Sequence, residues 1–240
     1  EVMDWNSEIS LLTGMCAGSL MVEHGAGLLR TLRPATAESE DTFRAEARAL
    51  GYELSDDLEI GEFLQLADAT DARGMAVMRE AQKLLRGSGY VSLADGEAEV
   101  HAGIGGHYAH VTAPLRRLVD RFATEYCLAI CAGQDIPAWV TERAGDVIES
   151  MQRTSQLAGT VDRACLDLTE ATVLAPWVGH NFDAVILTSD AERDQARIFV
   201  PRPPVLANAL GHPEQGTTTS VSLVRADVGT RDVAFAWPAD

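Results

Sequence analysis

HYAHVTAPLRRLVDRF, the stretch from His107 to Phe122, decides how the rest of the chain is interpreted. Pro114 suits the first turn of a helix, where its missing N–H is no loss, and it pushes the preceding residue toward an extended conformation. The stretch therefore predicts a helix that begins at Pro114. Apolar residues then recur at helical spacing and form one stripe for a core: Leu115, Leu118, Val119, Phe122, Tyr126 and Ile130.

Two arginines in the first turn of this expected helix indicate an anion site. Arg116 and Arg117 lie where the helix dipole disfavours cations, and Ala113 is a poor cap that leaves backbone N–H groups without an acceptor. A bound phosphate satisfies both demands. Asp120, four residues after Arg116, is expected to hold the Arg116 guanidinium in place. The alternative is a pair of solvated arginines with a local ion pair.

The segment YAHVTAPLRRLVD, from Tyr108 to Asp120, resembles the Y-x-H-F-T-S-P-I-R-R-Y-x-D signature of the ribonuclease II (RNB) exoribonucleases. In that family the segment lies beside the 3′ end of bound RNA, and its first arginine contacts the scissile phosphate. The resemblance thus implies that Arg116 is the catalytic phosphate contact. The further candidates for RNA and phosphate binding are Arg117, Thr112, Tyr108, His110, Asp120, Arg30, His101 and Arg163.

The resemblance extends along nearly the whole chain, as the second half of an RNB domain plus its barrel. The helix that starts near Asp4 is similar to a family helix, although Asn6 and Ser7 stand where glutamates are usual. The family holds a divalent metal with aspartates in the first half of its domain, and no matching segment exists here. The resemblance therefore implies Mg²⁺ or Mn²⁺ in the complete enzyme, with no metal ligand in this chain. Because the sequence opens at Glu1 and runs directly into an expected helix, we expect a processed product or a fragment.

Composition limits the classes of function. A net charge of −17 over 240 residues argues against nonspecific coating of nucleic acid, but it permits a local channel lined by arginine. No apolar run reaches the length needed to cross a bilayer, and no secretory signal is visible, so no membrane partner is expected. Four cysteines in a chain of this length indicate a reducing cytoplasm more than a disulfide framework.

The pattern along the chain predicts an α+β fold. Helices are expected over Asp4 to Glu23, Thr42 to Leu50, Ile60 to Thr70, Ala72 to Arg86, and Pro137 to Leu157 and on through Val173. After Pro176, short β-branched runs predict strands of a small OB-type barrel, with LANALG between two of them as a short helix or turn. We expect a mostly helical C-terminal portion of an RNB domain at 1–176 and an RNA-binding OB-type barrel at 177–240.

Several other side-chain groups suggest chemistry but have plainer interpretations. Cys127 and Cys131 suit a metal by spacing, yet buried cysteines commonly act as small hydrophobes. Three histidines, His101, His107 and His110, lack a helical zinc motif and are interpreted as polar loop residues near RNA. The remaining groups are an acidic set interpreted as a solvated helix face (Glu62, Asp68 and Asp71) and two barrel aromatics for base stacking or core packing (Phe182 and Phe199).

The resulting hypothesis is that this chain is part of a processive exoribonuclease, which hydrolyses single-stranded RNA from 3′ to 5′ and releases 5′-nucleotides. Its expected partners are single-stranded RNA and the N-terminal half of the same enzyme, and this chain by itself is predicted to be inactive. Two alternatives stay open: a noncatalytic RNA-binding remnant of the same family, and an acidic scaffold that binds a protein partner.

Overall fold

The computed structural model describes residues 2–55, 57–85 and 87–238, and it divides the chain into two compact units. The first unit contains the chain up to Pro34 and from Leu85 to Gly159; the second contains Ala35–Leu84 and the chain from Thr160 onward. The two units do not coincide with the domains predicted at 1–176 and 177–240, because residues 35–84 pack with the barrel. A functional boundary after residue 176 stays a prediction.

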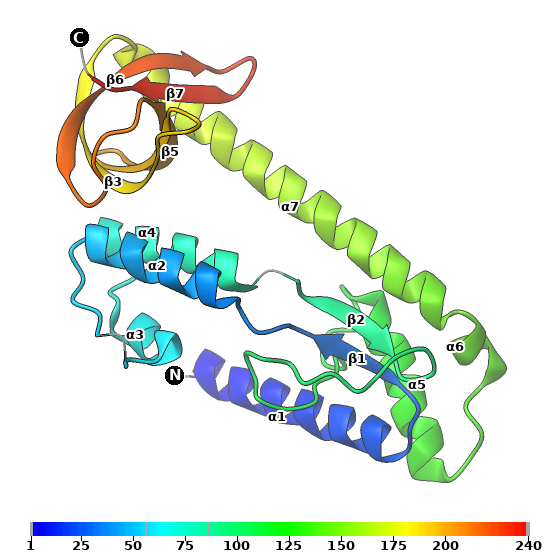
Figure 1. Cartoon of the computed structure of the whole chain (residues 1–240). Helices are drawn as coiled ribbons and strands as arrows, with labels where there is room; N and C mark the ends of the chain where they lie inside the picture. The colour runs from blue at the N-terminus through cyan, green and yellow to red at the C-terminus, as the bar shows by residue number, and fades with distance from the viewer. Residues whose placement is uncertain (1, 56, 86, 239–240) are drawn as a thin grey trace. The chain divides into compact units, whose positions relative to one another are not determined.

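The first unit is a helical layer around a two-stranded antiparallel sheet (Figure 1). Its elements are α1 (Val2–Glu23), β1 (Leu28–Thr31), β2 (Gly89–Ser92), α5 (Leu118–Ala132), α6 (Ala138–Glu142) and the first part of α7 (Ala144–Leu174). The strands pair so that Arg30 lies opposite Tyr90. Met21, Leu28, Val119 and Tyr126 are buried together in one apolar core, which explains why the α5 stripe has helical spacing.

The second unit is a closed five-stranded barrel with three helices against it. Its elements are α2 (Ala37–Ala49), α3 (Ile60–Leu66), α4 (Ala72–Ala81), a 3₁₀ turn η1 (Gln82–Leu85), the end of α7, η2 (Ala175–Trp177), β3 (Asn181–Asp190), β4 (Gln195–Pro201), β5 (Pro204–Leu210), β6 (Thr218–Asp227) and β7 (Asp232–Ala236). The strand order is β3-β4-β5-β7-β6, and β5 and β7 pair in parallel while the other pairs are antiparallel. The expected α+β class and OB-type barrel are confirmed.

The barrel encloses one apolar core and shares a second with the helices. Phe235, Leu223 and Ile198 are fully buried inside the barrel. Phe199 packs instead with Phe43 of α2 and with other apolar residues of the helices of the second unit. Because only 2% of Phe199 is exposed, its role is core packing, and the base-stacking alternative for this residue is wrong.

Several expected elements differ from the structure. LANALG forms most of β5 and is neither a helix nor a turn, because it pairs along its length with β4 and at its end with β7. The strands β1 and β2 lie in segments for which the sequence predicted no strand. α2 begins earlier than expected, with the Thr36 side chain accepting from the backbone of Ser39, and the expected helix end at Arg86 lies outside the described residues.

Candidate nucleic-acid interface

The segment after His107 lies directly against the backbone of α1 because two glycines make room for it. A Cβ atom on Gly18 would lie 2.8 Å from the backbone of His107. A Cβ atom on Gly14 would collide with the ring of Tyr108. The amide N of Ala109 donates a hydrogen bond to the carbonyl oxygen of Gly14 at 3.0 Å. Sequence reasoning missed these glycines, although their spacing of four on an expected helix indicates a close approach of backbones.

Four aromatic rings then form a continuous edge-to-face row. The centroids of His101 and Tyr108 are 5.8 Å apart, those of Tyr108 and His110 are 5.6 Å apart, and those of His110 and Tyr90 are also 5.6 Å apart. The hydroxyl of Tyr90 and Nδ1 of His110 share a hydrogen bond of 2.8 Å. The structure therefore brings together three residues that the sequence proposed and adds Tyr90, which the sequence did not suggest.

Arg30 of β1 covers the ring of Tyr90 on the neighbouring strand. Its guanidinium carbon lies 4.9 Å from the ring centroid, which is a cation–π distance. The guanidinium also donates to the hydroxyl of Ser88 at 2.7 Å and to the carbonyl of Gly89 at 3.3 Å. The backbone N–H of Arg30 donates to the carbonyl of Tyr108 at 2.8 Å, so β1 fixes the aromatic row from one side.

Burial and nearby arginines keep the histidines of this row neutral. Burial is the main cause that lowers the pKa of His110 to about 4, and Arg117 and Arg30 lower it further. Burial, with a smaller contribution from Arg30, also lowers the pKa of His101. Burial raises the pKa of the Tyr90 hydroxyl, so Tyr90 also stays neutral. At neutral pH, the row therefore offers uncharged rings beside fixed positive charges.

The expected helix start at Pro114 is wrong, because Pro114, Leu115 and Arg116 form a turn and α5 begins at Leu118. The backbone N–H groups of Arg116 and Arg117 both donate to the carbonyl of Ala113, at 3.2 and 3.0 Å. The arginines thus precede the helix and do not occupy its first turn.

The expected pairing of Asp120 with Arg116 is also wrong, because Asp120 holds Arg117. Nε of Arg117 lies 2.7 Å from Oδ2 and Nη2 lies 2.8 Å from Oδ1 of Asp120, and the backbone N–H of Ala113 donates to the same Oδ1 at 2.7 Å. The side chain of Asp120 is fully buried. It therefore fixes both ends of the turn, and the carboxylate supplies the acceptor that the sequence assigned to a phosphate.

Arg116 is left facing solvent by this arrangement. It is exposed and makes no side-chain hydrogen bond or ion pair with any residue that the structure describes, and Thr112 is exposed beside the same turn. Arg163 lies on the part of α7 that belongs to the second unit and is exposed there. The roles of all these residues in RNA binding stay predictions.

Within residues 2–55, 57–85 and 87–238, no group of three or more His, Cys, Asp or Glu side chains is arranged to hold a metal ion. Cys127 packs against the core of the first unit. Asp68 accepts hydrogen bonds from Thr70, and Asp71 caps α4 by accepting from the backbone of Arg73. The side chains of the described residues therefore do not form a binding site for the divalent metal that the family resemblance implies.

The closed barrel and the helical part that carries arginines and an aromatic row define the class of protein: an α+β protein with a helical part and an OB-type barrel. Residues 180–237, which form the barrel, match the family model described as the RNase II-type exonuclease C-terminal S1 domain. The resemblance inferred from the sequence is thereby confirmed. No curated protein matches the chain in sequence.

Solved structures share the fold over both units. RNase R of Mycoplasma genitalium, in complex with ribose-methylated single-stranded RNA, has a TM-score of 0.70 at 12% identity, with 96% of this chain and 40% of that chain covered. The Dss1 exoribonuclease of Candida glabrata gives 0.65 at 14% identity, covering 96% and 28%. Yeast Ssd1, a pseudonuclease, gives 0.58 at 16% identity, covering 85% and 26%. This chain thus spans less than half the length of the proteins that it resembles.

Proposed function

We propose that this chain is the C-terminal part of an exoribonuclease that degrades single-stranded RNA from 3′ to 5′, with Arg116 at the scissile phosphate. The observation that carries the proposal is the exposed guanidinium of Arg116 on a turn fixed by the buried Asp120–Arg117 pair. Preorganised donors stabilise charge that develops on a reacting phosphate, because they need no rearrangement during the reaction. Similarity to RNase R and to the RNase II-type S1 domain supports RNA as the ligand.

The surroundings of Arg116 suit a ribonucleotide chain. Arg117, Arg30 and Arg116 all lower the pKa of His110, and the carboxylate of Asp120 opposes them only in part, so positive charge predominates beside this ring in a chain whose net charge is −17. Tyr108, His110 and Tyr90 add neutral rings there, and rings of this kind stack on or border unpaired bases. Positive charge for phosphates and rings for bases are the two requirements of single-strand binding.

Hydrolysis needs a group that activates water, and the described residues do not supply a metal cage for it. On the family resemblance, we assign the ligands of Mg²⁺ or Mn²⁺ to the N-terminal half of the same enzyme. This chain contributes phosphate contacts and base contacts, and it is predicted to be inactive alone.

An exposed apolar side of α1 supports the N-terminal half of the enzyme as a binding partner. Its large side chains are 58–76% exposed: Val2, Met3, Trp5, Ile9 and Leu12. Exposed apolar patches of this kind mark contact surfaces in proteins. We propose that the N-terminal half of the enzyme covers them, which would bring its metal site to the unit that carries Arg116. No helix among the described residues has the length and apolarity to cross a membrane.

A noncatalytic RNA-binding protein is the second candidate. The missing carboxylate cage among the described residues and the likeness of the fold to the pseudonuclease Ssd1 favour it. Both candidates require RNA binding, whereas the third alternative, an acidic scaffold, does not. RNA binding therefore separates the first two from the third.

The experiment is fluorescence anisotropy with a labelled single-stranded oligoribonucleotide at several salt concentrations. We expect wild-type binding that weakens with salt, and for Arg116→Ala a slope of log affinity against log salt that is reduced by about 0.7, the value for one lost phosphate contact. Arg121→Ala is the matched control, because Arg121 is also exposed and follows on α5. Equal slopes for the two variants would refute a phosphate contact by Arg116, and absence of wild-type binding at low salt would support the scaffold.

A further inference from the structure

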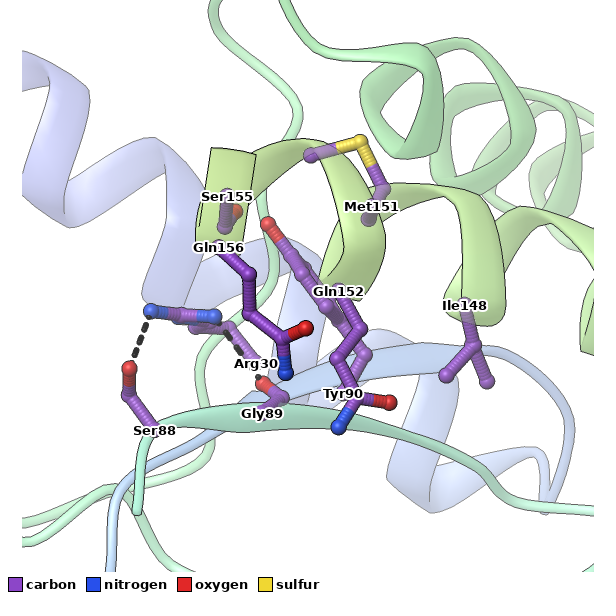
Figure 2. Close-up of a pocket in the computed structure, with 9 residues that line it drawn as sticks. All are labelled: Arg30, Ser88, Gly89, Tyr90, Ile148, Met151, Gln152, Ser155 and Gln156. Carbon is purple, nitrogen blue, oxygen red and sulfur yellow. Dashed lines mark hydrogen bonds between the residues drawn. The ribbon is translucent and has the colours of Figure 1, made fainter. Parts of the chain in front are cut away.

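The first unit contains a cavity of about 310 Å³ between β2 and α7 that the proposed phosphate contact does not use (Figure 2). One wall comes from β1, β2 and the loop before β2, and the other comes from a single stretch of α7. The lining residues are Arg30, Ser88, Gly89, Tyr90, Ile148, Met151, Gln152, Ser155 and Gln156. The volume falls at the lower end of ordinary small-ligand sites.

The α7 wall is one face of the helix, because its residues recur at intervals of three and four. Met151 and Ile148 belong to the apolar core of the unit, which anchors this face against the β2 side. Figure 2 shows the side chains of Gln152 and Gln156 extending from α7 toward β2. Two amides, each with a donor and an acceptor, thus project into the cavity beside its apolar residues, Ile148 and Met151.

The opposite wall combines an aromatic ring with a guanidinium. Arg30 lies over Tyr90 and is already bonded to Ser88 and Gly89, so its position is set before any ligand arrives. Arg30 is the charged residue of the cavity lining, and no carboxylate lines the cavity as the structure describes it. In a chain with 36 acidic residues, this cavity therefore excludes negative charge from its own walls.

We propose that this cavity binds one unstacked base of single-stranded RNA, read through the amides of Gln152 and Gln156. The inference rests on the proposed RNA-binding function and assigns the base contact, which is separate from the phosphate contact at Arg116. Amide side chains pair with the edges of bases, since both carry neighbouring donors and acceptors. Single-stranded RNA is commonly recognised by splayed bases held on aromatic or guanidinium planes, as Tyr90 and Arg30 provide.

The same residues disfavour a bare phosphate as the ligand. Phosphate oxygens only accept hydrogen bonds, so both amide oxygens would be left facing an anion. Arg30, the cationic donor of the lining, already donates to two groups of the protein. A purely apolar ligand would in turn place apolar groups against the Gln152 amide and the Ser155 hydroxyl, with no hydrogen bond to offer them.

The test is calorimetric titration of the whole chain with the four nucleoside 5′-monophosphates and with ribose 5-phosphate, which lacks the base. We expect at least one nucleotide to bind more tightly than ribose 5-phosphate. Gln152→Leu and Gln156→Leu should each weaken that binding by about fivefold, the loss expected for one hydrogen bond. Gln134→Leu is the matched control, since Gln134 is exposed between α5 and α6 in the same unit, and it should bind as the wild type does.

A competition experiment with single-stranded oligoribonucleotide shows whether the base comes from RNA. Displacement of the nucleotide by the oligomer supports the proposal, and binding of both at once refutes RNA as the source. Equal affinities for ribose 5-phosphate and for the nucleotides, or glutamine variants that match Gln134→Leu, would refute the base site even where the oligomer binds. Failure of the oligomer to bind at all would refute the proposed function itself.

Discussion

Replacement of Asp120 by alanine should destabilise the first unit severely. The carboxylate is fully buried and accepts three hydrogen bonds, two from Arg117 and one from the backbone N–H of Ala113. Its removal leaves the Arg117 guanidinium, only 14% exposed, without its counter-charge. Removal of one partner from a buried pair costs about 3–5 kcal/mol because the other charge stays desolvated, so we expect the free energy of unfolding to fall by about that amount.

The chain offers a matched control with the same spacing at the surface. Arg143 and Asp146 also form a pair three residues apart, at 2.9 Å, but their side chains are 69% and 66% exposed. Water and salt screen such a pair, so Asp146→Ala should cost only a small fraction of the loss for Asp120→Ala. The difference between the two variants isolates burial from spacing.

Urea unfolding followed by circular dichroism measures both variants against the wild type. Asp120→Asn is the informative third protein, because its amide oxygen keeps an acceptor for Ala113 while the negative charge is lost. It should lie between the wild type and Asp120→Ala in stability. Equal stabilities for Asp120→Ala and Asp146→Ala would mean that the turn before α5 does not depend on the buried carboxylate, and the argument for a preorganised Arg116 would fail with it.

Three further predictions follow from the same unit. In the enzyme completed by its N-terminal half, Arg116→Ala should slow single-turnover cleavage by about a hundred- to thousandfold while Arg121→Ala leaves it unchanged; equal rates would remove Arg116 from the reaction. The chain alone should release no mononucleotide from labelled RNA with Mg²⁺ or Mn²⁺, and EDTA-sensitive release from a pure preparation would contradict this. Burial of His110 should make the wild type lose about 2 kcal/mol of stability as pH falls from 6.5 toward 4, since the unfolded chain takes up a proton that the folded chain refuses; His110→Gln should not show this loss.

The regular elements could be predicted because their patterns are local. The apolar stripe of α5 and the β-branched runs of the barrel are visible in the sequence as regular spacings. The signature around Arg116 is likewise visible as one continuous segment. β1 and β2 could not be predicted in this way, since each has four residues and depends on its pairing with the other, in which Arg30 lies opposite Tyr90, 60 residues further along the chain. LANALG combines good helix formers, and only its pairing with β4 makes it a strand.

The site was predicted in its residues but not in its geometry. The signature named Arg116, Arg117 and Asp120, yet spacing alone paired Asp120 with the wrong arginine, because the helix was taken to start at Pro114. Once the backbone of Ala113 takes one oxygen of Asp120, Arg117 is the guanidinium within reach. Gln152 and Tyr90 had no signal of their own, since a cavity that joins two distant segments appears only in the folded chain.

Binding of RNA should change the protonation of His110, and this last prediction links charge to function. In the free protein, Arg117, Arg30 and Arg116 add to burial in holding its pKa near 4. A phosphate beside Arg116 offsets part of that positive field, so the pKa of His110 should rise in the complex, and RNA should bind more tightly as pH falls toward the pKa of His110 in the complex. NMR titration of the His110 ring with and without oligoribonucleotide measures both pKa values, and Arg116→Ala should shrink the difference. An unchanged pKa in a saturated complex would place the phosphates away from these arginines.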